Sequence, residues 1–69
     1  MSVHVTVNGH PRQLSQGATV ADIVDSLGLP RAGAVAVAVD DAVVARSAWG
    51  ETALADGQRV EVLIAVQGG

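Results

Sequence analysis

The last two residues, Gly68 and Gly69, are the part of this sequence best suited to covalent chemistry, because they place a free carboxylate on a narrow tip. Glycine has no Cβ, so its backbone accepts angles and close approaches that other residues resist. The plain alternative is a frayed terminus, and the chain is rich in glycine, with 8 in 69 residues. The glycines nevertheless follow directly on a strongly apolar run, Val60 to Val66, which favours a functional tip on a stiff strand.

The chemistry open to the carboxylate of Gly69 is acyl transfer. When extended, Gln67, Gly68 and Gly69 reach about 10 Å beyond the last strand residue, which suits insertion into a narrow channel on a partner. A carboxylate is a poor electrophile until one of its oxygens becomes a good leaving group. We therefore expect an ATP-using partner to activate Gly69 as an acyl-adenylate, with Gln67 and Gly68 as partner-binding residues.

Other groups with chemical potential lack the neighbours that they would need. His4 and His10 offer two metal ligands where a site needs more at compatible geometry, so no metal site is predicted. Ser15, Ser26 and Ser47 have no placed His and Asp partners for nucleophilic catalysis. The remaining glycines are scattered and form no phosphate-binding loop, so we expect the chain to bind no cofactor and its partner to bind the ATP.

Composition narrows the class of protein further. A chain of 69 residues makes one domain, and its core must be aliphatic because it has no Phe or Tyr and one Trp. Without cysteine there is no disulfide, thiolate metal site or thiol nucleophile, so any sulfur that it carries must be held by the terminal carboxylate. A formal charge of -3 argues against a nucleic-acid partner and favours docking to a basic protein surface.

No segment of the sequence indicates a membrane or an export signal. Residues 1–14 carry His4 and Arg12 inside an alternating pattern and lack a continuous apolar stretch. No run approaches the roughly 18 apolar residues that a membrane span needs. We expect a cytoplasmic protein with no membrane partner.

The N-terminal residues predict a β-hairpin. Valines alternate with polar residues over 2–7, which indicates a strand with one buried face and with His4 pointing outward. Asn8-Gly9 favours a tight turn into a second strand over 10–14. Because Pro11 cannot donate to a ladder, that strand is expected at an edge of the sheet.

A short helix is predicted from Val20 to Leu27. Thr19 provides its N-cap, Asp22 occupies the capping-box position, and Gly28 offers the left-handed stop. Apolar residues recur at positions i, i+3, i+4 and i+7 and form one continuous stripe. A helix of about two to three turns is unstable alone in water, so Ile23 and its apolar neighbours are expected to pack across a sheet.

Three further strands are predicted in the second half. Ala34 to Val39 is apolar on both faces, which is typical of a central strand. Asp40-Asp41 then makes a turn into a short strand at Val43-Val44. Asp56-Gly57 marks another turn, and the last strand runs from Val60 to Val66 with alternate residues facing inward.

This order of elements predicts an α+β fold of β-grasp type, in which a mixed sheet of four to five strands carries one helix across one face. We expect a single domain over residues 1–69, with 67–69 as a flexible tail. Leu63 and Ala65 should lie on the face away from the helix, near the root of the tail. They are predicted to bind a partner, the alternative being incidental exposure of apolar side chains.

Arg46 and Trp49 allow two interpretations. As interface residues, Trp49 would fill a pocket on a partner and Arg46 would pair with an acidic group there. As structural residues, Trp49 would pack over one end of the core and Arg46 would be held by an internal turn carbonyl. The structural interpretation is favoured, because a core of Val, Ala and Leu needs at least one large side chain to fill it.

Residues along most of the chain form a pattern shared with a known family. The most discriminating part is the spacing of Val44, Arg46 and Trp49 after an alternating Ala/Val strand, whereas terminal Gly-Gly fits every ubiquitin-like protein. The matching residues are Val5, Val7, Asn8-Gly9, Gly17, Thr19, Val20, Leu27, Val37-Ala38-Val39, Val44, Arg46, Trp49, Asp56-Gly57 and Gly68-Gly69. On these residues the chain resembles the ThiS family, the sulfur carriers of thiamin biosynthesis, which have the ubiquitin-like β-grasp fold.

The resemblance implies that the chain is a co-substrate and not an enzyme. An ATP-dependent activating enzyme would adenylate Gly69, a sulfur donor system would form the thiocarboxylate, and thiazole synthase would accept the sulfur. Three alternatives remain: a sulfur carrier of molybdopterin biosynthesis, a ubiquitin-like protein modifier joined through Gly69, and a binding module whose terminal glycines do nothing. Molybdopterin carriers tend to be longer and richer in aromatic residues, which favours the thiamin pathway.

Overall fold

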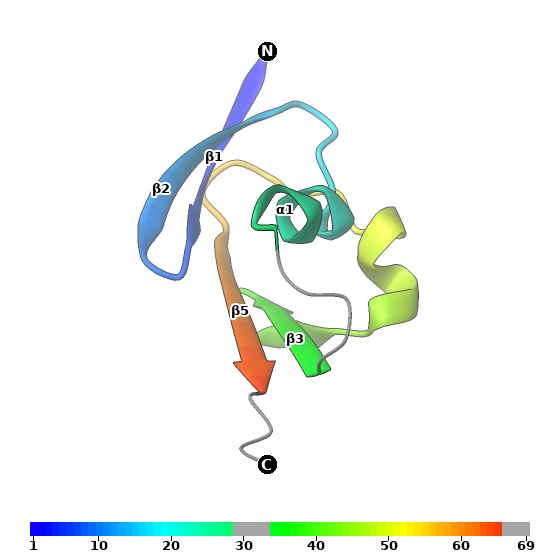
Figure 1. Cartoon of the computed structure of the whole chain (residues 1–69). Coiled ribbons are helices and arrows are strands. Elements are labelled where there is room, and N and C mark those ends of the chain that lie inside the picture. Colours follow the sequence, from blue (N-terminus) through cyan, green and yellow to red (C-terminus); the bar gives the residue numbers. More distant parts are fainter. Residues whose placement is uncertain (29–33, 66–69) are drawn as a thin grey trace.

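The strands of this protein form one mixed sheet that is crossed by a helix. The computed structural model describes residues 1–28 and 34–65. Within these residues the elements are β1 (Ser2–Val7), β2 (His10–Ser15), α1 (Val20–Ser26), β3 (Ala34–Val39), β4 (Ala42–Val44), a 3₁₀ helix η1 (Arg46–Glu51) and β5 (Arg59–Ala65). The sheet has five strands in the order β2-β1-β5-β3-β4 (Figure 1). The predicted β-grasp arrangement is confirmed.

The middle strand of the sheet is β5, which lies between β1 and β3. It pairs antiparallel with β3 over six residue pairs, from Val39↔Val60 to Ala34↔Ala65. With β1 it pairs in parallel over two, Thr6↔Arg59 and Val7↔Val60. The strand expected to be central, β3, is an interior strand between β5 and β4. The second half of β5 therefore has β3 as its one strand neighbour among the described residues.

Two-residue turns close both hairpins. The φ angles are 51° at Asn8, 82° at Gly9, 49° at Asp40 and 69° at Asp41. Positive φ at both central residues is the type I′ geometry that matches the twist of antiparallel strands. Gly9 adopts it without a steric penalty, and Asn and Asp tolerate it better than other residues with a Cβ. The predicted Asn8-Gly9 hairpin is confirmed, and β2, which carries Pro11, lies at an edge as expected.

The helix is capped as its sequence predicts. The hydroxyl of Thr19 accepts from the Asp22 N–H at 3.3 Å, and the Asp22 carboxylate accepts from the Thr19 N–H at 2.9 Å. This reciprocal capping box satisfies two backbone donors that a helix N-terminus otherwise leaves unpaired. The helix ends at Ser26 with Leu27 as its C-cap, one residue earlier than predicted. Gly28 follows with φ 64°, the left-handed stop that the sequence indicates.

The core lies between α1 and one face of the sheet. Alternate residues of β1, β3 and β5 point toward the helix because side chains alternate between the faces of a strand. The connection between β4 and β5 adds two further side chains. The buried residues are Val3, Val5, Val7, Val20, Ile23, Val37, Val39, Trp49, Leu54, Val60 and Val62. One apolar cluster thus joins the helix to all three interior strands.

The connection between β4 and β5 is anchored by Trp49, which is 8% exposed. Its indole N–H donates to the carbonyl of Val44 at 3.0 Å. The guanidinium carbon of Arg46 lies 5.2 Å from the centroid of the Trp49 ring, a cation–π contact. The structural interpretation of Trp49 is confirmed. Arg46 differs from the prediction, since the contact that holds it is the indole face and not a turn carbonyl.

Candidate functional site

The candidate site is organised around β5, the strand that leads to the C-terminal residues. Gln67, Gly68 and Gly69, the predicted reacting and partner-binding residues, lie outside the described residues, as does Val66. The described part of the strand ends at Ala65, whose backbone pairs with Ala34. The site is therefore described through β5 and the residues that contact it, because this strand leads to the tail.

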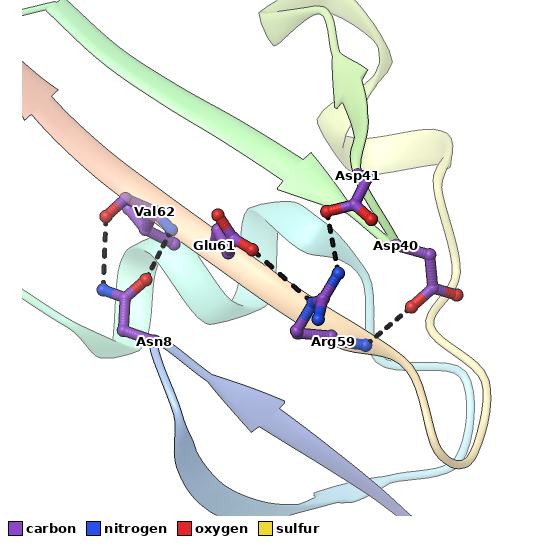
Figure 2. Close-up of polar contacts among 6 residues, drawn as sticks. All are labelled: Asn8, Asp40, Asp41, Arg59, Glu61 and Val62. Atoms are coloured by element: carbon purple, nitrogen blue, oxygen red, sulfur yellow. Dashed lines mark hydrogen bonds and ion pairs between the residues drawn. The ribbon is translucent and has the colours of Figure 1, made fainter.

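On the β1 side, the side chain of Asn8 holds β5. Its amide nitrogen donates to the carbonyl of Val62 at 3.2 Å, and its oxygen accepts from the Val62 N–H at 2.8 Å (Figure 2). The backbone N–H of Asn8 also donates to the carbonyl of Val60 at 2.9 Å. An Asn amide carries the same donor and acceptor as a peptide group, so it adds one step to the ladder after β1 has ended. Sequence reasoning assigned Asn8 to the turn and missed this role.

The start of β5 is held in a related way by the second hairpin. The N–H of Arg59 donates to the carboxylate of Asp40 at 2.9 Å, and the N–H of Asp40 donates to the Arg59 carbonyl at 2.8 Å. The guanidinium of Arg59 also lies 2.7 Å from Asp41 and 3.5 Å from Glu61 (Figure 2). Such exposed ion pairs contribute at most about 1 kcal/mol. They orient Arg59 rather than stabilise the fold.

The face of the sheet away from α1 carries an apolar surface next to the root of the tail. Leu63 is 67% exposed and Val43 is 81% exposed. The strand register sets Leu63 opposite Ala36, and Ala38 opposite both Glu61 and Val43. We refer to Ala36, Ala38, Val43 and Leu63 as the outer apolar surface. Leu63 thus points outward as the alternation predicts, whereas the side chain of Ala65 lies outside the described part.

Burial falls along β5 toward the tail. Val60 is 0% exposed and Val62 is 6% exposed, but Ile64, which alternation also assigns to the inner face, is 42% exposed. Val60 has both β1 and β3 beside it, whereas Ile64 pairs with β3 alone among the described strands. The expectation that Ile64 is an inward residue like the two valines is therefore only partly met. Apolar side chains are exposed on both faces near the tail.

His4 takes part in a turn contact. Its backbone N–H donates to the Asp56 carboxylate at 2.6 Å, and its ring Nδ1 lies 3.5 Å from the same oxygen. The N–H of Gly57 donates back to the His4 carbonyl at 2.7 Å. These bonds fasten the Asp56-Gly57 turn to β1. Over residues 1–28 and 34–65, no three His, Asp or Glu side chains gather to hold a metal, and neither helix has the length and apolarity of a membrane span.

A mixed five-stranded sheet with one helix across it, whose middle strand leads to a C-terminal Gly-Gly, defines a small ubiquitin-like β-grasp protein. The model of the ThiS family matches residues 5–69. This chain belongs to the ThiS family.

A solved ThiS structure is similar over nearly the whole chain. It is the crystal structure of a thiamine biosynthesis protein, ThiS, from Geobacter metallireducens, with 33% sequence identity and a TM-score of 0.74. The match covers 97% of this chain and 100% of that one. No curated protein matches the sequence. The family match and the structural match therefore agree.

Proposed function

We propose that this chain is a sulfur carrier of thiamin biosynthesis and that the carboxylate of Gly69 carries the sulfur. The observation that supports this most is the family match over residues 5–69, which runs through Gly68-Gly69. The similar ThiS structure is that of a thiamine biosynthesis protein. Family membership also favours thiamin over molybdopterin biosynthesis.

The thiocarboxylate is formed in two proposed steps at the carboxyl group of Gly69. The Gly69 carboxylate attacks the α-phosphorus of ATP on an activating enzyme, and pyrophosphate leaves. Hydrosulfide supplied by a donor system then attacks the acyl carbon, the C–O bond to phosphate breaks, and AMP leaves. The resulting thiocarboxylate gives its sulfur to thiazole synthase. The chain is a co-substrate in this scheme, because the partner enzymes bind ATP and supply the acids and bases.

The outer apolar surface is the proposed docking face for these partners, and Leu63 is its member nearest to the tail. We propose that Ala65 extends this face and that Gln67 and Gly68 enter the partner's channel. Leu63 is 67% exposed on the same strand that leads to Gly69. Apolar area in water next to a reactive tail favours a protein partner, because covering it is energetically favourable. The Arg59 and Glu61 side chains that border it add charge selectivity at the rim.

The deciding experiment is intact-mass spectrometry after co-expression with an activating enzyme and a sulfur donor. We expect a mass gain equal to the replacement of one oxygen by sulfur, located in the C-terminal peptide. A chain without Gly69 is the matched control and should gain nothing. If the activating enzyme converts an authentic carrier but leaves this chain at its original mass, the proposal is wrong. Conjugates to lysine side chains would instead indicate a protein modifier.

A further inference from the structure

We infer that Asn8 is a positioning residue for the C-terminal tail. Within the described residues, its side chain makes the last hydrogen bonds to β5 on the β1 side of the sheet. It therefore determines which residues of β5 are bonded on both sides before the tail begins. The step from strand position to the reaction of Gly69 rests on the proposed function. The step from Asn8 to strand position rests on contacts within the fold.

Asn8 replaces a missing strand residue beside β5. The last pair between β1 and β5 is Val7↔Val60, after which the chain turns at Asn8-Gly9. The next β5 residue that faces β1 is Val62, and both of its backbone groups are taken by the Asn8 side chain, at 3.2 and 2.8 Å. Both hydrogen bonds are partly buried. An unpaired backbone group at such a position is unfavourable, so the amide has a structural reason to stay there.

The strand loses its two-sided support after Val62. Leu63, Ile64 and Ala65 pair with β3 only, and no described strand lies on their other side. A strand with one neighbour opens locally at lower free energy than one held from both sides. The Asn8 clamp, meaning the two side-chain hydrogen bonds from Asn8 to Val62, is therefore the last two-sided attachment among the described residues before the tail. Without the clamp, the last described attachment of β5 on the β1 side is the bond from the Asn8 N–H to the Val60 carbonyl.

The clamp matters for the reaction because it is the last described attachment on the β1 side of β5 before the tail. The reacting carboxylate must reach a fixed point in the active site of the partner, and a misplacement of about 1 Å can lower the rate about a hundredfold. The docking face itself does not include Asn8. Because Leu63 belongs to both the loosened segment and the docking face, loosening the strand should lower the rate of the bound complex more than it weakens docking.

The chain offers a matched control at Asp40. Asp40 is the first residue of the other two-residue turn, has φ 49° against 51° at Asn8, and likewise accepts an N–H from β5 through its side chain. It holds Arg59, at the opposite end of the strand from the tail. Asn8→Gly and Asp40→Gly both preserve the positive φ, because glycine adopts it readily. Each removes one side-chain attachment of β5.

The first measurement uses the free protein. Amide order parameters from ¹⁵N relaxation are compared for Leu63, Ile64 and Ala65 in the parent chain and in both variants. We expect Asn8→Gly to lower them from the rigid value of about 0.85 toward the flexible range below about 0.6, and Asp40→Gly to leave them unchanged. Unchanged order parameters in Asn8→Gly, or an equal fall in both variants, would overturn the clamp.

The second measurement is ATP–pyrophosphate exchange by the activating enzyme at varied concentrations of the carrier. We expect Asn8→Gly to lower kcat about two- to tenfold, the factor that corresponds to an ordinary hydrogen bond, with a smaller rise in KM for the carrier. Asn8→Asp keeps the acceptor for the Val62 N–H but places a carboxylate oxygen beside the Val62 carbonyl, so it should also lower kcat. Asp40→Gly should match the parent. A rise in KM alone, or the same loss in both glycine variants, would contradict the positioning role.

The two proposals fail differently. A parent chain that supports no pyrophosphate exchange would defeat the proposed function, while the order parameters would still decide whether Asn8 holds the end of β5. A normal parent with an equally normal Asn8→Gly variant would defeat the positioning role alone.

Discussion

Leu63 lies directly opposite Ala36 in the β3–β5 ladder, on the face of the sheet that α1 does not cover. The small side chain of Ala36 cannot shield its larger neighbour, which leaves Leu63 67% exposed. A leucine in the middle strand of a sheet would usually be covered by a second layer. Here its position next to the tail suits a partner protein as that layer.

Replacing Leu63 by Asp should weaken association with the activating enzyme or with thiazole synthase by at least about tenfold, as for other central interface residues. The fold should stay intact, because substitutions of exposed side chains usually change the free energy of unfolding by less than about 0.5 kcal/mol. Isothermal titration calorimetry measures the first effect and circular dichroism the second. Ser47→Asp, which adds the same charge on η1, is the control and should bind normally. Equal affinities for both variants would assign Leu63 to incidental exposure.

Replacing Ile23 by Ala should lower the free energy of unfolding by about 2 to 5 kcal/mol, as for other large-to-small changes in a core. Ile23 is 2% exposed and is the largest side chain among those fully buried, so its loss leaves a cavity between α1 and the sheet. For a domain of this size each kcal/mol corresponds to about 4–8 °C in Tm. Asp25→Ala, on the exposed side of the same helix, should shift Tm little. A melting curve that Ile23→Ala leaves in place would contradict the packing described for α1.

Replacing Arg46 by Gln should lower stability by about 0.5–1 kcal/mol, because the guanidinium lies over the Trp49 ring. Urea unfolding followed by Trp49 fluorescence measures this directly, since the chain contains one Trp. Arg12→Gln changes the net charge equally on the edge strand β2 and should affect neither stability nor the native emission maximum. If the two variants behave alike, the contact with Trp49 contributes nothing beyond charge.

Deleting Gly69 should abolish activation. The deletion moves the terminal carboxylate back by about 3.3 to 3.6 Å of extended chain, several times the displacement that lowers an oriented reaction about a hundredfold. Appending one alanine should be as damaging, because it places the reacting carbon in a peptide bond and presents a branched residue to the channel. Both variants should melt like the parent, since the buried core of the described residues ends at Val62. Pyrophosphate exchange and thiazole formation are the assays. If either variant supports thiazole formation at the parent rate, the chain is better explained as a binding module whose terminal glycines have no function.

The sequence by itself determined the elements whose causes are local. The Asn8-Gly9 turn, the Thr19–Asp22 capping box and the alternation of β1, β3 and β5 depend on neighbouring residues and on the fixed periods of helix and strand. The family pattern rests on the same local residues. The outward position of Leu63 also follows, because alternation alone decides which face of a strand a side chain occupies.

Only the tertiary structure decided how β5 is held. Its place at the middle of the sheet, its two-pair register with β1 and the partial exposure of Ile64 depend on which strands lie beside it. The hydrogen bond between Asn8 and Val62 joins residues 54 positions apart. An Asn-Gly pair is favoured in a tight turn whether or not the Asn side chain also bonds a distant strand, so the sequence gives no sign of this bond. Contacts of that separation depend on the global chain path, which local periodicity and turn chemistry do not encode.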